Sequence, residues 1–135
     1  MNTFAPDWLR QRVPFDAAAR SADLGRRFAA ALGGEPGAPR RIVDLAAGSG
    51  ANFMALAPLV GGAQDWLLVD GDPSLLAAQP AEIGRWALDA GWRCRSDGDG
   101  VVVETESSRW RARARQLDLA RSLEQVDFSG CHGVS

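Results

Sequence analysis

The sequence predicts an α/β fold in which two neighbouring parallel strands end, one at a glycine-rich turn and one at an acidic turn. The first observation is an apolar run at 41–46 that leads into the glycine-rich residues 46–50. The second is another apolar run, at 66–69, that ends in Asp70 after a helical segment. In α/β sheets this succession builds a nucleotide-type site at the carboxyl ends of adjacent strands.

Composition limits the chain to one small domain. It has 135 residues, 46% of them hydrophobic, and a formal net charge of −2. A chain without net positive charge has no general attraction for nucleic acid, so composition speaks against that partner. The two cysteines form no disulfide framework, and the N-terminal residues lack the apolar stretch of a signal peptide or a membrane span. We therefore predict a cytoplasmic protein without membrane association.

Residues 1–14 are predicted to form an N-terminal arm, and residues 15–135 a single domain. Asp16 is expected to cap a helix that runs to about Leu32, where Gly33 follows. A periodic apolar stripe predicts the buried face of this helix, made of Leu24, Phe28, Ala31 and Leu32.

Asp44 is the anomaly of the first strand. A carboxylate inside a buried apolar run costs several kcal/mol if it is unpaired. Two partners are open: amides of the neighbouring loop, or a cationic ligand group, which we favour. In the turn that follows, Gly48 and Gly50 allow positive φ and the close approach of a ligand to the backbone.

Phe53 stands where the dinucleotide pattern GxGxxG has its third glycine. That glycine lets helix and strand pack closely beneath a pyrophosphate, so a phenylalanine favours a wider turn and a ligand without pyrophosphate. The helix over 51–60 is expected to bury Phe53, Leu56 and either Leu59 or Val60. We expect it to end near Pro58 and Gly61.

Asp70 follows the second strand, about 20 residues after the glycines, the spacing at which an acid accepts the two hydroxyls of a ribose. Asp72 with Pro73 begins the next helix, and capping and ligand contact are both open for Asp72. Pro80 is expected to divide that helix, with a second piece over 81–90 and Gly91 as its cap.

Residues 92–118 change to an alternating pattern that predicts a β-hairpin and a long strand over 109–117, with turns at 97–100 and 107–108. One face of the strand at 109–117 carries four arginines: Arg109, Arg111, Arg113 and Arg115. A phosphate-binding surface is one interpretation of this stripe. We favour a solvated face that pairs with Glu104 and Glu106, because the net charge is negative.

The C-terminal segment is expected to complete the parallel sheet. Residues 116–120 are predicted to form the third strand of the parallel sheet, with the acid Asp118 at its end. A short helix to about Val126 is expected to follow, and residues 133–135 are expected to open another strand. Cys131 and His132 are too small a cluster for a metal site.

These motifs resemble the class I S-adenosylmethionine-dependent methyltransferases. The run from Asp44 to Gly50 is similar to the family's first motif, an acid and alternating glycines, with Ala46 in place of the usual first glycine. Residues 69–76 resemble the second motif, an acid that ends strand two before a polar residue, Pro and Leu. Asp118 with Leu119 matches the third acid. The resemblance covers residues 15–135 and implies a Rossmann-like fold with a β-hairpin inserted before strand three.

The resemblance also implies S-adenosylmethionine as the cofactor, lying across the carboxyl ends of three strands. Its methionine part would pack on the turn at Ala46, Gly48 and Gly50. Asp44 would meet the ammonium of that part, directly or through water. Its ribose and adenine would meet the later segments: Asp70, which holds both ribose hydroxyls, then Gly71, Asp72, Asp118 and Leu119.

The family places its acceptor pocket on strand four and later strands, whereas this sequence stops at Ser135. We therefore expect a fold truncated at the start of strand four, a cofactor-binding half that alone binds its donor weakly or not at all and turns over little. Strand one would become a sheet edge, through which a dimer could form. The methyl acceptor is unknown, with a small molecule as one candidate, and no residue is identified as a catalytic base.

Two alternatives remain open from the sequence. One is an NAD(P)- or flavin-binding oxidoreductase domain, against which Phe53 argues. The other is a non-catalytic remnant or interaction module that keeps the fold without the pocket.

Overall fold

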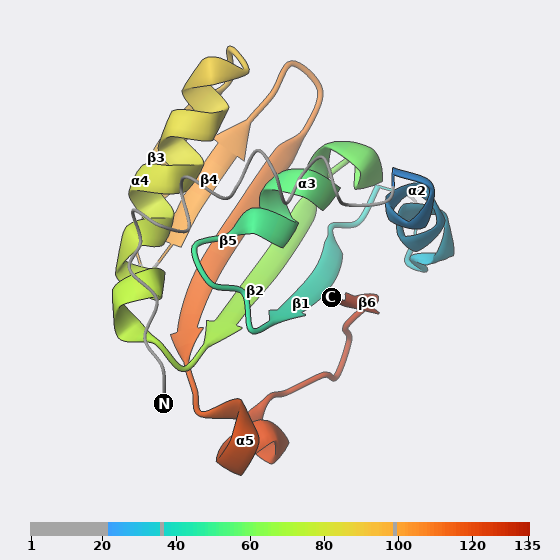
Figure 1. Ribbon diagram of the computed structural model, residues 1–135. Helices are drawn as coiled ribbons and strands as arrows, with labels where there is room; N and C mark the ends of the chain where they lie inside the picture. Colours follow the sequence, from blue (N-terminus) through green and yellow to red (C-terminus); the bar gives the residue numbers. More distant parts are fainter. Residues whose placement is uncertain (1–21, 36, 99) are drawn as a thin grey trace.

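The computed structural model describes residues 22–35, 37–98 and 100–135 (Figure 1). The predicted arm at 1–14 and the predicted cap Asp16 lie outside these residues. The described chain is an α/β fold with a mixed six-stranded sheet in the order β3-β4-β5-β2-β1-β6. This arrangement is compatible with a Rossmann-like fold.

The strands are β1 (Arg40–Leu45), β2 (Gln64–Asp70), β3 (Arg93–Asp97), β4 (Gly100–Glu104), β5 (Arg109–Gln116) and β6 (Gly133–Val134). The helices are α2 (Ala22–Ala31), α3 (Ala51–Val60), α4 (Pro73–Asp89), α5 (Leu119–Ser122) and the short 3-10 helix η1 (Leu123–Gln125). Four strands, β5, β2, β1 and β6, run parallel, whereas β3 and β4 form an antiparallel hairpin beside β5. The hairpin expected before the third parallel strand is therefore present.

The expectation that strand one would be a sheet edge is wrong. β6 pairs with β1 in parallel, with Ile42 opposite Gly133 and Val43 opposite Val134. The ladder extends beyond β6, because the amide of Leu45 donates to the carbonyl of Ser135 at 2.9 Å. The outer edge on this side of the sheet is thus the two-residue β6, and dimer formation through an edge stays a prediction.

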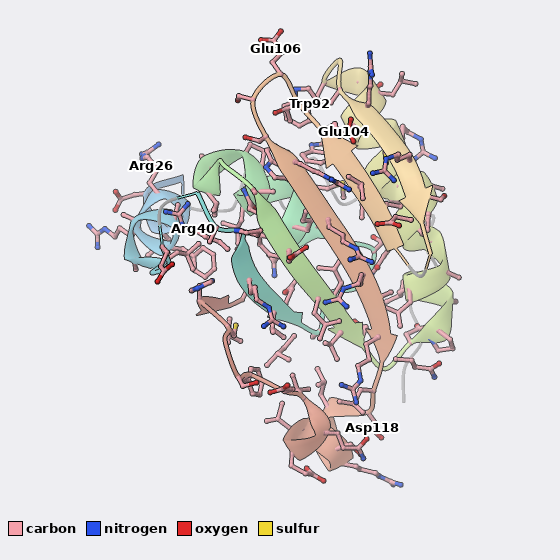
Figure 2. All side chains as sticks on the ribbon, turned by 180° about the vertical axis from the view of Figure 1, so that it is seen from behind. Arg26, Arg40, Trp92, Glu104, Glu106 and Asp118 are labelled. Atoms are coloured by element: carbon pink, nitrogen blue, oxygen red, sulfur yellow. The ribbon has the colours of Figure 1, made fainter. Side chains whose placement is uncertain are left out.

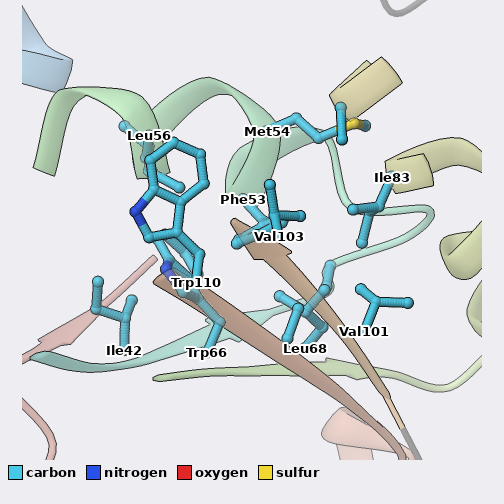
Figure 3. Close-up of a cluster of buried hydrophobic side chains, with 14 of the residues drawn as sticks. Ile42, Phe53, Met54, Leu56, Trp66, Leu68, Ile83, Val101, Val103 and Trp110 are labelled. Atoms are coloured by element: carbon cyan, nitrogen blue, oxygen red, sulfur yellow. The ribbon is translucent and has the colours of Figure 1, made fainter. Parts of the chain in front are cut away.

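The main core lies between one face of the sheet and helices α3 and α4 (Figure 3). Phe53 and Trp66 are fully buried there, and Trp86, Trp92 and Trp110 form a second aromatic group at the hairpin end. A smaller cluster covers part of the opposite face, where Val43 and Val69 pack against residues 117–131. Burial on both faces explains the near-continuous apolar character of β1 and β2.

Helix α3 has the predicted limits, and Gly61 ends it with φ 64°. Val60 packs on the core whereas Leu59 is 43% exposed, which settles the choice between the two. Pro58 lies inside the last turn and does not end the helix.

The predicted break in α4 at Pro80 is wrong, because the helix runs without interruption to Asp89. Leu75 before the proline and Ile83 and Ala87 after it are all buried against the sheet. Tertiary packing on both sides therefore outweighs the lost backbone hydrogen bond. Gly91 follows the cap residue Ala90 with φ 80° and donates to the carbonyl of Leu88 at 3.0 Å.

Two further expectations are wrong: the buried stripe of the first helix and the strand over residues 116–120. Leu24 is 65% exposed and Ala31 is also exposed, because only Phe28 and Leu32 of the predicted stripe reach the body of the protein. Residues 116–120 do not form a separate strand: β5 itself is the third parallel strand and ends at Gln116, and α5 begins at Leu119. Among the described helices, none combines the length and apolar character that a bilayer span requires.

Candidate functional site

Three segments meet at the carboxyl ends of β1, β2 and β5, because the carboxyl ends of parallel strands share one edge of the sheet. They are the turn at 46–50, the acidic segment at 70–72 and residues 117–119. Backbone hydrogen bonds of 2.9 Å join them, from Ala47 to Val69 and from Leu117 to Asp70. The sequence-predicted residues are therefore brought to one end of the sheet.

Asp70 connects these segments through its side chain. One carboxylate oxygen, Oδ2, accepts from the amide of Gly48 at 2.8 Å, and the other, Oδ1, accepts from the amide of Asp72 at 2.9 Å. A carboxylate has about four lone-pair positions, so each oxygen keeps capacity for another donor. Asp70 thus holds the glycine turn against the end of β2 while retaining acceptor capacity for a ligand hydroxyl.

The two glycines of the turn have different roles. Both have positive φ, 57° at Gly48 and 102° at Gly50. A β-carbon at Gly50 would lie 3.4 Å from Cδ1 of Ile83, so the side of Gly50 is already covered by α4, and its φ of 102° favours glycine. A β-carbon at Gly48 would meet nothing within 4 Å. Gly48 is therefore the position where the turn opens onto free space.

Ala46 adopts φ 57°, a left-handed conformation that glycine favours. An L-residue in this conformation costs about 1–2 kcal/mol. Ala46 therefore carries backbone strain at the start of the turn.

Replacing Ala46 with glycine is expected to raise the free energy of unfolding by about 0.5–1 kcal/mol. Relief of the left-handed strain exceeds the entropy that glycine adds to the unfolded chain. Urea denaturation followed by circular dichroism measures the change. Ala77→Gly in the exposed part of α4 is the matched control, with an expected loss of about 0.5–1 kcal/mol. A loss of stability in both variants would contradict the prediction.

Asp44 is fully buried, at 0% exposure. Its Oδ1 accepts from the side-chain amide of Asn52 at 3.2 Å, which ties the end of β1 to the first turn of α3. The carboxylate does not reach the surface. The expected contact with a ligand ammonium would therefore require a bridging water or a local opening of the turn.

Asp72 and Asp118 are both helix caps. Asp72 is buried, and its Oδ1 accepts from the amide and the hydroxyl of Ser74 at 2.9 and 2.7 Å. Asp118 is exposed and accepts from the amide of Ala120 at 3.1 Å. Capping, one of the two possibilities left open for Asp72, is thus confirmed, and ligand contact stays a prediction for both acids. Leu119 is half-buried and packs on the smaller core cluster.

Gln79 is a site residue that the sequence analysis missed. It is buried on α4, and its side-chain amide donates to the carbonyl of Gly48 at 2.8 Å. Together with Asp70 it fixes both the N–H and the C=O of Gly48. The sequence does carry a signal for this role: Gln79 is a polar residue within the apolar stripe of α4 that faces the sheet, between Leu75 and Ile83.

The strand ends carry carboxylates, and Phe53 lies in the core beneath the turn with its ring 5.4 Å from that of Trp66. This arrangement disfavours a pyrophosphate and favours a ligand with positive charge and hydroxyl groups.

Away from the site, Cys131 donates to the carbonyl of Gly133, and Nδ1 of His132 accepts from the amide of Arg41 at 2.9 Å, so both have structural roles. Burial raises the pKa of the Cys94 thiol, which favours its protonated form.

No family model, curated protein or solved structure matches this chain. The residues at the strand ends and their chemistry are therefore what indicates a function for this chain.

Proposed function

We propose that the strand-end site binds S-adenosylmethionine and that the chain serves methyl transfer to an unidentified acceptor. The observation that carries the proposal is the contact between Asp70 and Gly48, which places a carboxylate beside a glycine turn that opens onto free space. A sulfonium and an ammonium group suit a site that is rich in carboxylates, whereas a pyrophosphate does not.

In this proposal each of the three segments contacts a different part of the cofactor. Ala46, Gly48 and Gly50 offer the backbone of the turn to the methionine part, with Asp44 behind them for the ammonium. Asp70 accepts from the ribose hydroxyls with the lone pairs that its two backbone contacts leave. The adenine lies among the residues of the last two segments: Gly71, Asp72, Asp118 and Leu119.

The bound cofactor supplies an electrophilic methyl group on a good leaving group. The task of the chain is to orient the cofactor and to exclude water from the reacting face. A general base is needed only for an acceptor that must lose a proton, and no residue of the site is assigned this role.

Calorimetric titration of the full chain with S-adenosylhomocysteine and, separately, with NAD tests the proposal. We expect weak but saturable binding of S-adenosylhomocysteine and none of NAD. Binding of NAD alone would favour an oxidoreductase domain and would reject the proposal. Binding of neither, together with a stable dimer, would favour a non-catalytic interaction module.

Gly48→Ala is the variant that tests the turn itself. The added methyl group would occupy the free space over the turn, so S-adenosylhomocysteine affinity should fall at least tenfold, equivalent to about 1.4 kcal/mol. Gly91→Ala is the matched control, because Gly91 also has positive φ and free space around it but lies beyond the far end of α4. Both variants should lose similar stability, about 1–2 kcal/mol, and only Gly48→Ala should lose affinity.

A further inference from the structure

The arginines of the hairpin region gather on one face of the sheet. Cross-strand partners point to the same face, and the register places Arg93 beside Glu104 and Glu104 beside Arg109. In the next row Arg95 and Arg111 both flank Val102. We call this surface the arginine face; its members lie on β3 and β5 and are Arg93, Arg95, Arg109, Arg111, Arg113 and Arg115.

The arginine face carries a surplus of positive charge. The same face of β2, β3 and β4 holds three acids, Asp65, Asp97 and Glu104, against the six arginines. Two of these acids form ion pairs, Arg111 with Asp97 at 3.3 Å and Arg95 with Glu104 at 3.6 Å. Three arginines therefore remain in excess on a chain whose net charge is −2. Charge is segregated on the surface, which the total charge conceals.

Helices α3 and α4 lie on the opposite side of the sheet, and Figure 2 looks onto the arginine face. Val102 of β4, which the register places between Arg95 and Arg111, is fully buried. A protein–protein interface has an apolar centre depleted of charge, and this surface has the reverse composition. The occupant that it fits is therefore a polyanion rather than an ordinary protein surface.

The chemistry favours phosphate over carboxylate chains. β5 presents four guanidinium groups at alternate positions along a line of roughly 20 Å. The guanidinium fork binds phosphate oxygens in pairs. Four tryptophans, Trp66, Trp86, Trp92 and Trp110, belong to the core on the other face, so they offer no platform for stacking bases here.

We propose that the arginine face binds the phosphate backbone of a nucleic acid without base specificity. The sequence analysis favoured a solvated face because the net charge is negative. The register adds Arg93 and Arg95 of β3 to the stripe of β5 and so converts a line of charges into a patch.

Fluorescence anisotropy of the full chain with a labelled oligouridylate of about 20 nucleotides, over a series of salt concentrations, tests the proposal. We expect binding at about 50 mM salt and a slope of log K against log salt of roughly −2 to −4, from three to six phosphate contacts. The triple variant Arg109→Gln, Arg113→Gln, Arg115→Gln should bind at least tenfold more weakly, with a slope reduced by about 2.

The control triple variant is Arg26→Gln, Arg27→Gln, Arg85→Gln, which removes the same charge from exposed positions off the arginine face. It should bind as the unmodified chain does. Equal losses in the two triple variants, or a slope near zero for the unmodified chain, would overturn the proposal. Binding of polyglutamate in place of oligouridylate would overturn it in favour of an acidic protein partner. If circular dichroism shows that the face variant is unfolded, the single variant Arg113→Gln and the salt slope of the unmodified chain decide.

Discussion

Replacing Phe53 with alanine is expected to lower the free energy of unfolding by about 3–5 kcal/mol. Phe53 is 0% exposed and packs from α3 into the main core, between the sheet and α4. Its ring makes edge contacts with Trp66 at 5.4 Å and with Trp86 at 5.9 Å between centroids. Removing it leaves a cavity that the rigid neighbours cannot close and deletes two aromatic pairs. Guanidinium denaturation followed by far-ultraviolet circular dichroism measures the loss.

Phe128→Ala is the matched control, because Phe128 is 38% exposed and its replacement should cost less than about 1 kcal/mol. If Phe53→Ala does not fold, Phe53→Leu keeps most of the volume and should cost roughly 1–1.5 kcal/mol. Losses of equal size at the two phenylalanines would contradict the assignment of Phe53 to the rigid centre of the core. The same packing means that a third glycine at this position would remove a core side chain rather than restore a dinucleotide-binding turn.

Much of the fold could be predicted from local pattern. The apolar runs of β1 and β2, the limits of α3 and the hairpin before β5 all follow from periodicity and turn residues, which act over short distances along the chain. The predictions that failed depend on tertiary contacts. Pro80 stays helical because residues on both sides of it are buried, and β1 is covered because residues 132–135 return to it from far along the sequence.

The site shows the same division. The positions of Asp44, Asp70 and Asp72 at strand ends could be predicted because parallel strands place their carboxyl ends together. The pairing of Asp70 with Gly48 and the role of Gln79 could not, because both are side-chain contacts across 22 and 31 residues of chain. The positive φ of Ala46 was likewise hidden, since alanine gives no signal of a left-handed conformation.

Asp70→Asn is expected to weaken both the turn and the proposed ligand binding. Two backbone amides, of Gly48 and of Asp72, donate to the two carboxylate oxygens. An asparagine has one oxygen, so in either orientation one of these amides faces an NH₂ donor. The cost of the mismatch is about 1–3 kcal/mol of stability. Because a charged acceptor for the ribose hydroxyls is lost as well, S-adenosylhomocysteine affinity should fall roughly 10–100-fold.

Asp127→Asn is the control for Asp70→Asn, because Asp127 also accepts from a backbone amide, that of Ser129 at 2.9 Å, but does so on an exposed loop. Its replacement should leave S-adenosylhomocysteine affinity unchanged. Denaturation and calorimetric titration of both variants separate the two roles of Asp70. Lost stability with unchanged affinity would leave Asp70 as the residue that orders the turn and would remove it from the ligand site. Unchanged stability would contradict the two hydrogen bonds to the carboxylate of Asp70, because the replacement by asparagine removes one of the two acceptor oxygens.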